Sequence, residues 1–225
     1  MDIREVPPGE FNRHPWEISR AQNTIELMKT YLSGLHENGR NLNIANIGAG
    51  DMYFDREYLK AFPGDTIWAI DLEYKEFSSG EENLFLVNDI GDVKDVIFDA
   101  VVLMNLMEYV DDEVAFLNDL CNRMNPDAII FFILPAFQFL FSEHDVYVKG
   151  LRRYRNNRFM EIIKNTQCLE LNVSFYFYST LFLVRTLEKF FHFATDRHQK
   201  NVAKWKYPKN HIITRSTTKL LNLDF

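Results

Sequence analysis

An alternation of short apolar runs with amphipathic stretches is the feature that most constrains the fold of this 225-residue chain. Five apolar runs have the length and composition of strands. They cover residues 41–47, 66–70, 84–87, 98–104 and 128–134. Helical patterns separate several of them, at 54–62 and 111–124. Strands that alternate with helices predict an α/β fold with a mainly parallel sheet.

Further elements flank this central region. The spacing of apolar residues predicts a leading helix over 15–35 and helices over 156–166 and 181–193, while alternation predicts a sixth strand over 169–178. We therefore expect three parts. They are an N-terminal arm and lid helix (1–40), a ligand-binding core (41–180) and a C-terminal helical extension (181–225).

Small and acidic residues follow the first three strands. Ligands of parallel sheets bind at the carboxyl ends of the strands. Gly48 and Gly50 form a tight turn that lets a ligand approach the backbone, and an acid, Asp71, follows about 20 residues later. Asp89 can accept a hydrogen bond from an exocyclic amine, and Ile90 can pack on a purine ring. Together these residues predict a nucleoside pocket.

Two nucleoside ligands compete for such a pocket. A dinucleotide normally requires a third glycine three residues after the second, and Tyr53 stands there. S-adenosylmethionine has no phosphate and does not need the full turn. The series of glycine turn, acid and Asp-apolar pair therefore fits S-adenosylmethionine better.

The same segments, 43–51, 70–71, 87–90, 98–109 and 124–128, resemble the motifs of class I S-adenosylmethionine-dependent methyltransferases. Residues 135–145 and 150–155 resemble the small-molecule branch grouped as type 11. The resemblance covers about 14–180. It implies a Rossmann-like fold with a mainly parallel seven-stranded sheet flanked by helices, S-adenosylmethionine as cofactor and a small-molecule acceptor.

The resemblance and the strand-end pattern also assign site residues. The expected cofactor-binding residues are Gly48, Ala49, Gly50, Asp71, Leu72, Asp89, Ile90, Asn105, Trp16 and Arg20. The expected acceptor-binding residues are Tyr109, Asp145, Arg152, Arg153 and Tyr154. For Trp16 and Arg20, a core tryptophan and a surface arginine remain the alternative.

A methyltransferase needs a general base only if the nucleophile arrives protonated, as a hydroxyl does. His144 is the first candidate, because it follows the fifth strand and Asp145 could orient its imidazole. Glu108, after the fourth strand, is the second. The structural alternatives are a loop histidine in a turn and an acid that stabilises a helix N-terminus.

Five cations fall within residues 149–158, the one clear basic cluster of an acidic chain. Arginine suits phosphate or carboxylate, so an anionic group on the acceptor is expected. We expect methylation at oxygen, in a sugar, lipid-linked glycan or natural-product pathway. Structural ion pairs are the alternative interpretation of the cluster.

A second function class stays open. Asn46 and Met52 replace an acid and a small residue that are frequent in the family. They admit a non-catalytic subunit that binds S-adenosylmethionine and acts through its aromatic C-terminal half. The aromatic residues of 175–193 suit a core, an acceptor channel, a homodimer face or contact with a membrane surface.

Composition excludes several other classes. With a net charge of −7, the chain as a whole has no electrostatic preference for nucleic acid. No metal-ligand spacing is present, and the first residues have no apolar signal sequence. The longest apolar run, 128–141, is interrupted and too short to span a bilayer. Cys121 and Cys168 have no redox spacing, so we expect reduced thiols and a cytoplasmic location.

Overall fold

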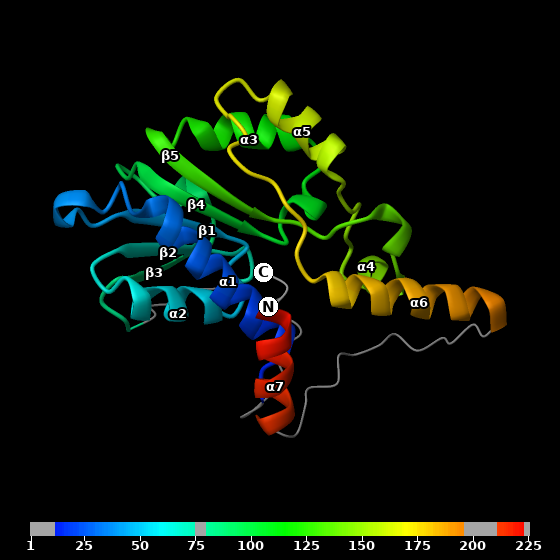
Figure 1. Cartoon of the computed structure of the whole chain (residues 1–225). Helices are drawn as coiled ribbons and strands as arrows, with labels where there is room; N and C mark the ends of the chain where they lie inside the picture. The colour runs from blue at the N-terminus through cyan, green and yellow to red at the C-terminus, as the bar shows by residue number, and fades with distance from the viewer. Residues whose placement is uncertain (1–11, 75–79, 196–210, 223–225) are drawn as a thin grey trace.

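A computed structural model describes residues 12–74, 80–195 and 211–222. Its centre is a parallel sheet of five strands in the order β3-β2-β1-β4-β5 (Figure 1). The strands are β1 (Asn43–Ile47), β2 (Thr66–Ile70), β3 (Leu84–Val87), β4 (Phe98–Met104) and β5 (Met124–Ile133). The predicted α/β class is confirmed.

Seven α-helices surround the sheet in the described residues. They are α1 (Pro15–Leu32), α2 (Tyr53–Ala61), α3 (Glu113–Cys121), α4 (Glu143–Tyr147), α5 (Asn156–Asn165), α6 (Ser179–Thr195) and α7 (His211–Asn222). Single 3-10 turns are η2 (Glu37–Gly39), η3 (Ile90–Asp92), η4 (Met107–Tyr109) and η5 (Gln138–Leu140). Local sequence explains several starts. Pro15 opens α1, and the Asp112 side chain accepts a hydrogen bond from Ala115 N to cap α3.

The helices form two layers, one on each face of the sheet. Side chains of α1 and α2, such as Met28 and Tyr58, pack with Ile44 of β1 in one core. Side chains of α3 and α5, such as Leu117 and Ile162, pack on the opposite face in the other. Both faces of the central strands are therefore covered, which explains why β4 is apolar at every position except Asp99 and why four of the five residues of β1 are buried (Figure 1).

The strand order reverses between β1 and β4. From β1 the chain proceeds to β2 and β3 on one side, and then returns to β4 and β5 on the other. The connections that leave the carboxyl ends of β1 and β4 run in opposite directions from this point, and open α/β sheets bind ligands there. The fold therefore brings the glycine turn after β1 next to the residues that follow β2 and β4.

Two predictions about strands are wrong for the described residues. The sheet has five strands instead of seven, and residues 169–178 form no strand. Their apolar residues alternate, but Leu171, Val173 and Phe175 are exposed, and the segment pairs with no strand of the sheet. The predicted helix over 181–193 is confirmed as α6.

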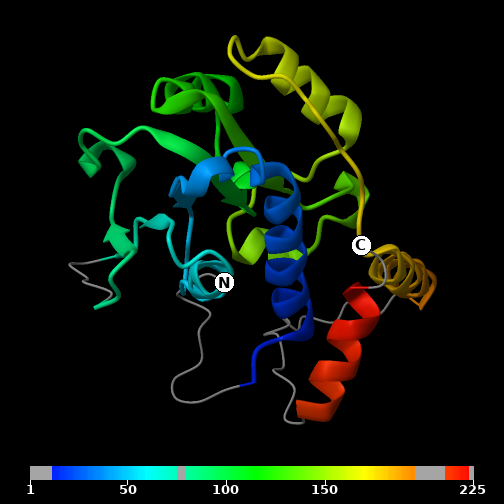
Figure 2. The same cartoon turned by 60° about the vertical axis from the view of Figure 1, so that its left-hand side comes forward.

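The C-terminal helix α7 packs against the leading helix α1 (Figure 2). The Ser19 hydroxyl donates to Asn222 Oδ1, and the amide of the same asparagine donates to Gln22 at 2.9 Å. Thr218 Oγ1 donates to Pro15 O at 3.4 Å. The two helices are therefore joined along their length although about 200 residues separate them.

The prediction of reduced cysteines is wrong. Cys121, the last residue of α3, and Cys168, just after α5, form a disulfide with 6.4 Å between their Cα atoms. They are 47 residues apart, so only the packing of α3 on α5 brings them together. The cytoplasmic location rested on reduced thiols, so the disulfide removes its argument. Within 12–74, 80–195 and 211–222, no helix has both the length and the apolar character to cross a membrane.

Candidate functional site

The turn after β1 has a backbone suited to glycine. Gly48 and Gly50 have φ angles of 76° and 62°, in the left-handed region. The amides of Gly48 and Ala49 both donate to Ile70 O, at 2.8 and 3.1 Å, which fixes the turn against the end of β2. A Cβ on Gly48 would lie 3.0 Å from a side-chain carbon of Leu106. Gly48 is nevertheless exposed, so its backbone is open to a ligand.

Asp71, at the end of β2, lies against this turn. Its Oδ2 accepts a hydrogen bond from Gly50 N at 2.9 Å, and its Oδ1 accepts one from Glu73 N at 3.0 Å. The buried Tyr74 donates from its hydroxyl to Gly50 O at 2.7 Å. The carboxylate is therefore held in place while each oxygen keeps a further lone pair. Leu72 is 78% exposed and points to solvent.

The ends of β3 and β4 complete the predicted cofactor set. Asp89 is exposed, and its Oδ1 accepts from Gly91 N at 2.7 Å to start η3. Ile90 packs at the edge of the core that contains α3. Asn105 follows β4 with a φ angle of 53°, and its backbone N–H donates to Ile133 O. All of these residues therefore stand at one edge of the sheet.

The start of α1 is tied to the glycine turn. Arg13 forms an ion pair with Asp51, and its guanidinium lies 4.1 Å from the centre of the Tyr53 ring. It also pairs with Glu17 at 3.5 Å. Sequence analysis did not identify Arg13 as a site residue, because Asp51 and Tyr53, which it contacts, lie 38 and 40 positions later in the chain. The contact places the lid helix over the turn.

Arg20, also on α1, is almost fully buried at 8% exposed, and its guanidinium lies 4.5 Å from the Trp16 ring centre. Burial lowers the pKa of Arg20, against the opposing effect of Glu17. Its Nε is buried and has no hydrogen-bond acceptor among the described residues. A buried guanidinium with an unused donor indicates a place for an anionic ligand group.

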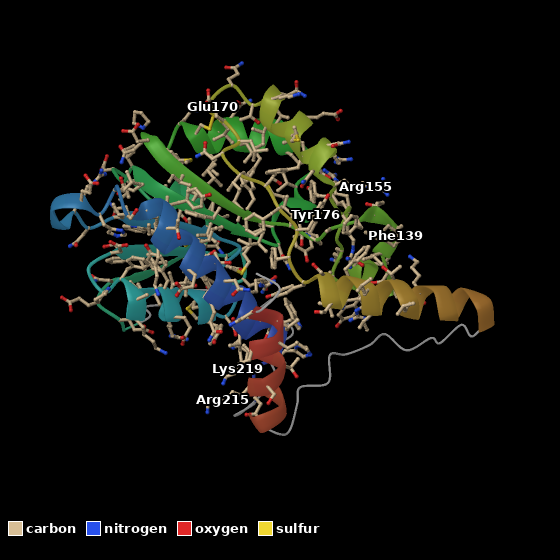
Figure 3. The ribbon with its side chains drawn as sticks, viewed as in Figure 1. Phe139, Arg155, Glu170, Tyr176, Arg215 and Lys219 are labelled. Carbon is tan, nitrogen blue, oxygen red and sulfur yellow. A yellow bond between two sulfur atoms is a disulfide. The ribbon has the colours of Figure 1, made fainter. Side chains whose placement is uncertain are left out.

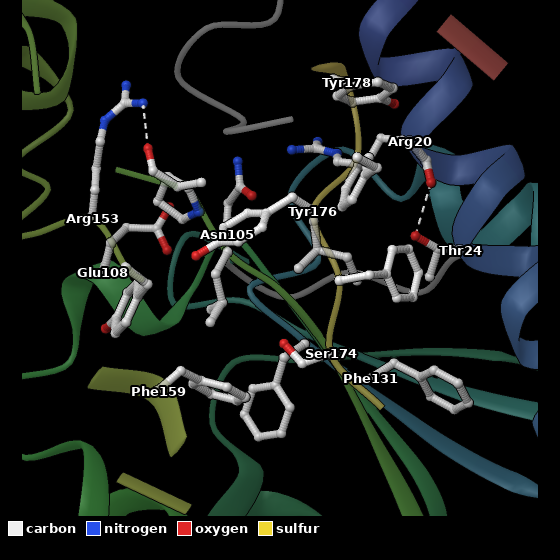
Figure 4. Close-up of a pocket in the computed structure, with 18 of the residues that line it drawn as sticks. Arg20, Thr24, Asn105, Glu108, Phe131, Arg153, Phe159, Ser174, Tyr176 and Tyr178 are labelled. Atoms are coloured by element: carbon white, nitrogen blue, oxygen red, sulfur yellow. Dashed lines mark hydrogen bonds between the residues drawn. The ribbon is translucent and has the colours of Figure 1, made fainter. Parts of the chain in front are cut away.

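Glu108, in η4, is a buried acid beside Asn105 and Arg20. It is 6% exposed, and burial raises its pKa to about 7, although Arg20 and Arg153 act to lower it. Its Oε2 is buried without a hydrogen-bond donor in the described part of the chain. Figure 4 shows the Glu108, Asn105 and Arg20 side chains around the same cavity. A carboxyl group of this pKa can exchange a proton near neutral pH.

That cavity has a volume of about 1750 Å³ and extends from α1 along β5 to α6. Many aromatic side chains line it. They include Phe131, Phe137, Phe159, Tyr176, Tyr178 and Phe182. Phe137 stacks on Tyr176 with 4.8 Å between the ring centres (Figure 4). The cavity is larger than the 300–1000 Å³ usual for small-molecule sites.

Several cavity residues escaped sequence analysis. Thr24 lies one helical turn after Arg20 on α1, a spacing that could have indicated a shared face. Ser174 belongs to the segment with the strand-like alternation, so no pattern placed its side chain in a cavity, whereas an acceptor channel was one interpretation of the aromatic residues of 175–193, which include Tyr176. Trp16, Asn105 and the predicted acceptor residue Tyr109 do line it.

His144, the first-choice base, lies on α4 and lines the cavity. Its neighbour Asp145 has other hydrogen bonds. Asp145 accepts from the Ser142 backbone and hydroxyl in a capping box, and from both Nε and Nη2 of Arg153 at 2.9 Å. Adjacent residues of a helix do not face each other. Asp145 therefore positions Arg153, which differs from the predicted role of orienting His144.

Much of the basic cluster forms structural ion pairs. Arg152 and Arg158 both pair with Glu113 of α3, at 2.6 and 3.1 Å. Although burial acts to raise the pKa of Glu113, hydrogen bonds from these arginines lower it. Tyr154 is buried, and its hydroxyl donates to Met107 O at 2.7 Å. Arg152 is thus directed to α3, while Arg153 (Figure 4) and Arg155 border the cavity. Figure 3 shows Arg155 near Tyr176.

A second buried acid lies behind the glycine turn. Asn46, on β1, donates from its side-chain amide to Asp55 Oδ1 of α2 at 2.8 Å. Both residues are buried, and burial raises the pKa of Asp55 to about 7. The asparagine that departs from the family pattern is therefore the partner of a carboxyl group that holds its proton near neutral pH.

No protein-family model matches this sequence, and no curated protein matches it. Solved structures do resemble it. The plantazolicin methyltransferase BamL, crystallised with a triazolic desmethylPZN analog and SAH, superposes with a TM-score of 0.53 at 13% identity, over 80% of this chain and 79% of BamL. The chain has the Rossmann-like methyltransferase fold. The predicted fold class is thus confirmed, apart from the number of strands.

Two other solved structures give lower scores. The magnesium protoporphyrin IX methyltransferase ChlM from Synechocystis PCC 6803, with bound SAH, has a TM-score of 0.47 at 12% identity, over 72% of this chain and 80% of ChlM. The mitomycin 7-O-methyltransferase MmcR has a TM-score of 0.42 at 14% identity, over 68% of this chain. This chain spans about half of MmcR, at 54%.

Proposed function

We propose that this protein is an S-adenosylmethionine-dependent methyltransferase that methylates a hydroxyl oxygen of a small molecule. The observation that carries the proposal is the position of Glu108. This buried carboxyl lines a large cavity together with the predicted cofactor residues Arg20 and Asn105. The SAH bound to BamL, whose fold is similar, supports the cofactor.

The residues at the strand ends fit this cofactor. The glycine turn, exposed at Gly48, admits a ligand close to the backbone, and Asp71 has lone pairs left for the two ribose hydroxyls. Asp89 and Ile90 would hold the adenine, and the unused Nε of Arg20 would bind the methionine carboxylate. The cofactor, when bound, supplies an electrophilic methyl group on a sulfonium.

Glu108 would act as the general base. Its carboxylate would accept the proton of the acceptor hydroxyl, whose oxygen would take the methyl group that the bound cofactor supplies. A pKa of about 7 suits a base that works near neutral pH. His144, which lines the same cavity on α4, is the alternative base.

The cavity favours an elongated and largely apolar acceptor. Its aromatic walls suit a natural product or the lipid part of a lipid-linked sugar, and BamL was crystallised with a triazolic desmethylPZN analog. An anionic acceptor group would meet Arg155 and Arg185, which border the cavity, instead of Arg152.

The direct test is turnover. The purified chain would be incubated with methyl-labelled S-adenosylmethionine and a panel of hydroxylated apolar acceptors, each with and without a carboxylate or phosphate group. We expect label in an ether product, with Glu108→Gln as the inactive control. Tight cofactor binding with no labelled product from any acceptor would contradict catalysis.

One observation favours a second candidate function. The outward face of α6 is apolar, with Leu183, Val184 and Leu187 each more than half exposed. Such a face suits a protein partner, and a non-catalytic S-adenosylmethionine-binding subunit would use it this way. A second copy of the chain or a membrane surface would suit it as well. Sedimentation of the chain alone, with vesicles and with cell extract distinguishes self-association, membrane binding and binding of another protein. Leu183→Glu should abolish whichever association is observed.

A further inference from the structure

Strand β5 forms an edge of the sheet that is open along most of its length. It is the longest strand, at 10 residues, and pairs with β4 on one side only. No other strand of the described residues pairs with its second side. Beyond its end, Pro135 O and Phe137 N are both bonded to Tyr154, which closes the edge there. The open part is therefore the stretch 128–134.

The register shows which backbone groups of β5 face outward. Ile133 O accepts a hydrogen bond from Asn105 N, so Ile133 faces β4. The N–H and C=O of one residue point to the same side of a strand, and the side alternates along it. The groups of Ile129 and Phe131 thus also bond to β4. Those of Ala128, Ile130, Phe132 and Leu134 point away from the sheet.

These outward groups face the cavity. Every residue from Pro126 to Ala136 borders it, so it follows β5 along its length. The opposite wall is the segment 168–178. The groove is largely apolar, and an unpaired backbone N–H or C=O in such a place is costly. A ligand that offers matching donors and acceptors would gain hydrogen bonds as well as apolar contact.

We propose that the acceptor is an extended chain of amide groups, a short peptide or a peptide-derived molecule, that pairs with the outward edge of β5 inside this cavity. The inference rests on the proposed function, because it names the class of acceptor. The stretch 128–134 is about 20 Å long, enough for six or seven extended residues. Its carboxyl end lies beside Asn105, three residues before Glu108, because Asn105 N donates to Ile133 O at 2.8 Å, and Glu108 borders the same cavity. One end of the bound chain therefore lies at the base.

The walls explain why a slender ligand fits better than a strand of a second copy. Segment 168–178 is held at one end by the Cys121–Cys168 disulfide. Near its other end, Asn156 N donates to the Tyr176 hydroxyl at 2.9 Å, and Tyr176 stacks on Phe137. A strand attached to a folded body would have to displace this wall. A free extended chain can enter along the groove.

Hydrogen–deuterium exchange of the full chain tests the inference. The probe is a capped hexapeptide of alternating valine and serine at millimolar concentration. We expect it to slow exchange at the amides of Ile130 and Phe132 at least several-fold, because these amides face the groove. The same peptide with every second amide N-methylated should give no protection, since it lacks the donors. Equal protection by both peptides, or by neither, would overturn the inference.

Two proline variants provide the matched pair. Ile130→Pro removes an outward N–H without breaking the bonds to β4, and should weaken peptide binding at least tenfold. Leu86→Pro removes an outward N–H from β3, the strand at the opposite edge of the sheet. Val87 O accepts a hydrogen bond from Asp71 N, so Val87 faces β2 and the N–H of its neighbour Leu86 faces outward. Leu86→Pro should leave binding unchanged. Equal losses in both variants would overturn the inference, and so would a dimer whose β5 amides are already protected.

The thermal shift caused by S-adenosylhomocysteine, measured on the same samples, distinguishes a failure of this inference from a failure of the proposed function. A shift with no peptide protection refutes the amide-chain acceptor and leaves the methyltransferase intact. Peptide protection with no shift refutes the proposed function and supports a peptide-binding groove.

Discussion

At the scale of single residues, two buried carboxyl groups define how the site depends on pH. Glu108 and Asp55 lie on different sides of the sheet's carboxyl edge, one beside the cavity and one behind the glycine turn. Burial raises the pKa of both to about 7. They differ in access, because Glu108 borders the cavity whereas Asp55 is enclosed with Asn46. Only Glu108 can therefore exchange a proton with an acceptor.

Replacing Glu108 by glutamine should remove the base while keeping the side chain's shape. A base works in its deprotonated form, so kcat/KM of the wild type should rise with pH and level off above about 7. In Glu108→Gln, kcat should fall about 100- to 10,000-fold, and that rise should disappear. A pH–rate profile checks this. If the rise persists, another group such as His144 is the base.

Asp55 should lower the stability of the fold as pH rises. The folded state keeps the proton of Asp55 up to about pH 7, while the unfolded chain releases it near its ordinary pKa of 3.8. The free energy of unfolding therefore falls between about pH 4 and pH 7. Asp55→Asn keeps an oxygen for the Asn46 amide and removes this contribution, so its urea midpoint should exceed that of the wild type at pH 8. A lower midpoint at pH 8 would show that the fold stabilises the ionised carboxylate, which would contradict the raised pKa of Asp55.

At the scale of elements, two long-range connections hold the walls of the cavity. Helix α7 fixes the lid helix α1, and the disulfide fixes the start of segment 168–178 to α3. Both join parts of the chain that are far apart in the sequence. The shape of the cavity thus depends on contacts outside the cofactor motifs.

The packing of α7 on α1 can be tested with a pair of leucines. Leu221 is 6% exposed and borders the cavity, while Leu220 is 54% exposed on the same helix. Leu221→Ala should lower the free energy of unfolding by about 2–4 kcal/mol and weaken S-adenosylhomocysteine binding, because α1 carries Arg20. Leu220→Ala should change stability by about 0.5 kcal/mol or less. Chemical denaturation and calorimetry measure both effects, and equal losses would refute the bracing role of α7.

The disulfide should contribute to stability by restricting the unfolded chain. A crosslink across 47 residues is worth about 4 kcal/mol in the chain-entropy description. The double variant Cys121→Ser and Cys168→Ser should melt well below the oxidised wild type and should match the wild type in dithiothreitol. A wild type whose melting does not respond to dithiothreitol would show that the thiols are not paired.

At the scale of the whole molecule, the local part of the site was predictable and the long-range part was not. Gly48, Gly50 and Asp71 could be placed at one sheet edge because each directly follows an apolar run, and strand ends of a parallel sheet meet. The partner of Arg152 is Glu113, 39 positions earlier, so sequence alone could not show that this arginine faces α3.

An acceptor channel was one interpretation of the aromatic residues of 175–193, but the extent of the cavity was missed for the same physical reason. Its far wall, 168–178, alternates like a strand, but a strand requires a neighbour with a matching register, and none is within reach. Likewise, the disulfide depends on how α3 packs on α5. The fold class follows from the local pattern of apolar residues. The cavity wall, the disulfide and the number of strands follow from tertiary packing.

The central claim is that the strand-end residues bind S-adenosylmethionine. It is tested most directly by calorimetric titration with S-adenosylhomocysteine of the wild type, Asp71→Ala and the exposed-loop control Asp92→Ala, with circular dichroism to verify folding. We predict saturable one-to-one binding, weakened about 10- to 100-fold in Asp71→Ala because two ribose hydroxyls lose their acceptor, and unchanged in Asp92→Ala. A folded wild type that gives no binding heat at several temperatures and no thermal shift would contradict the claim.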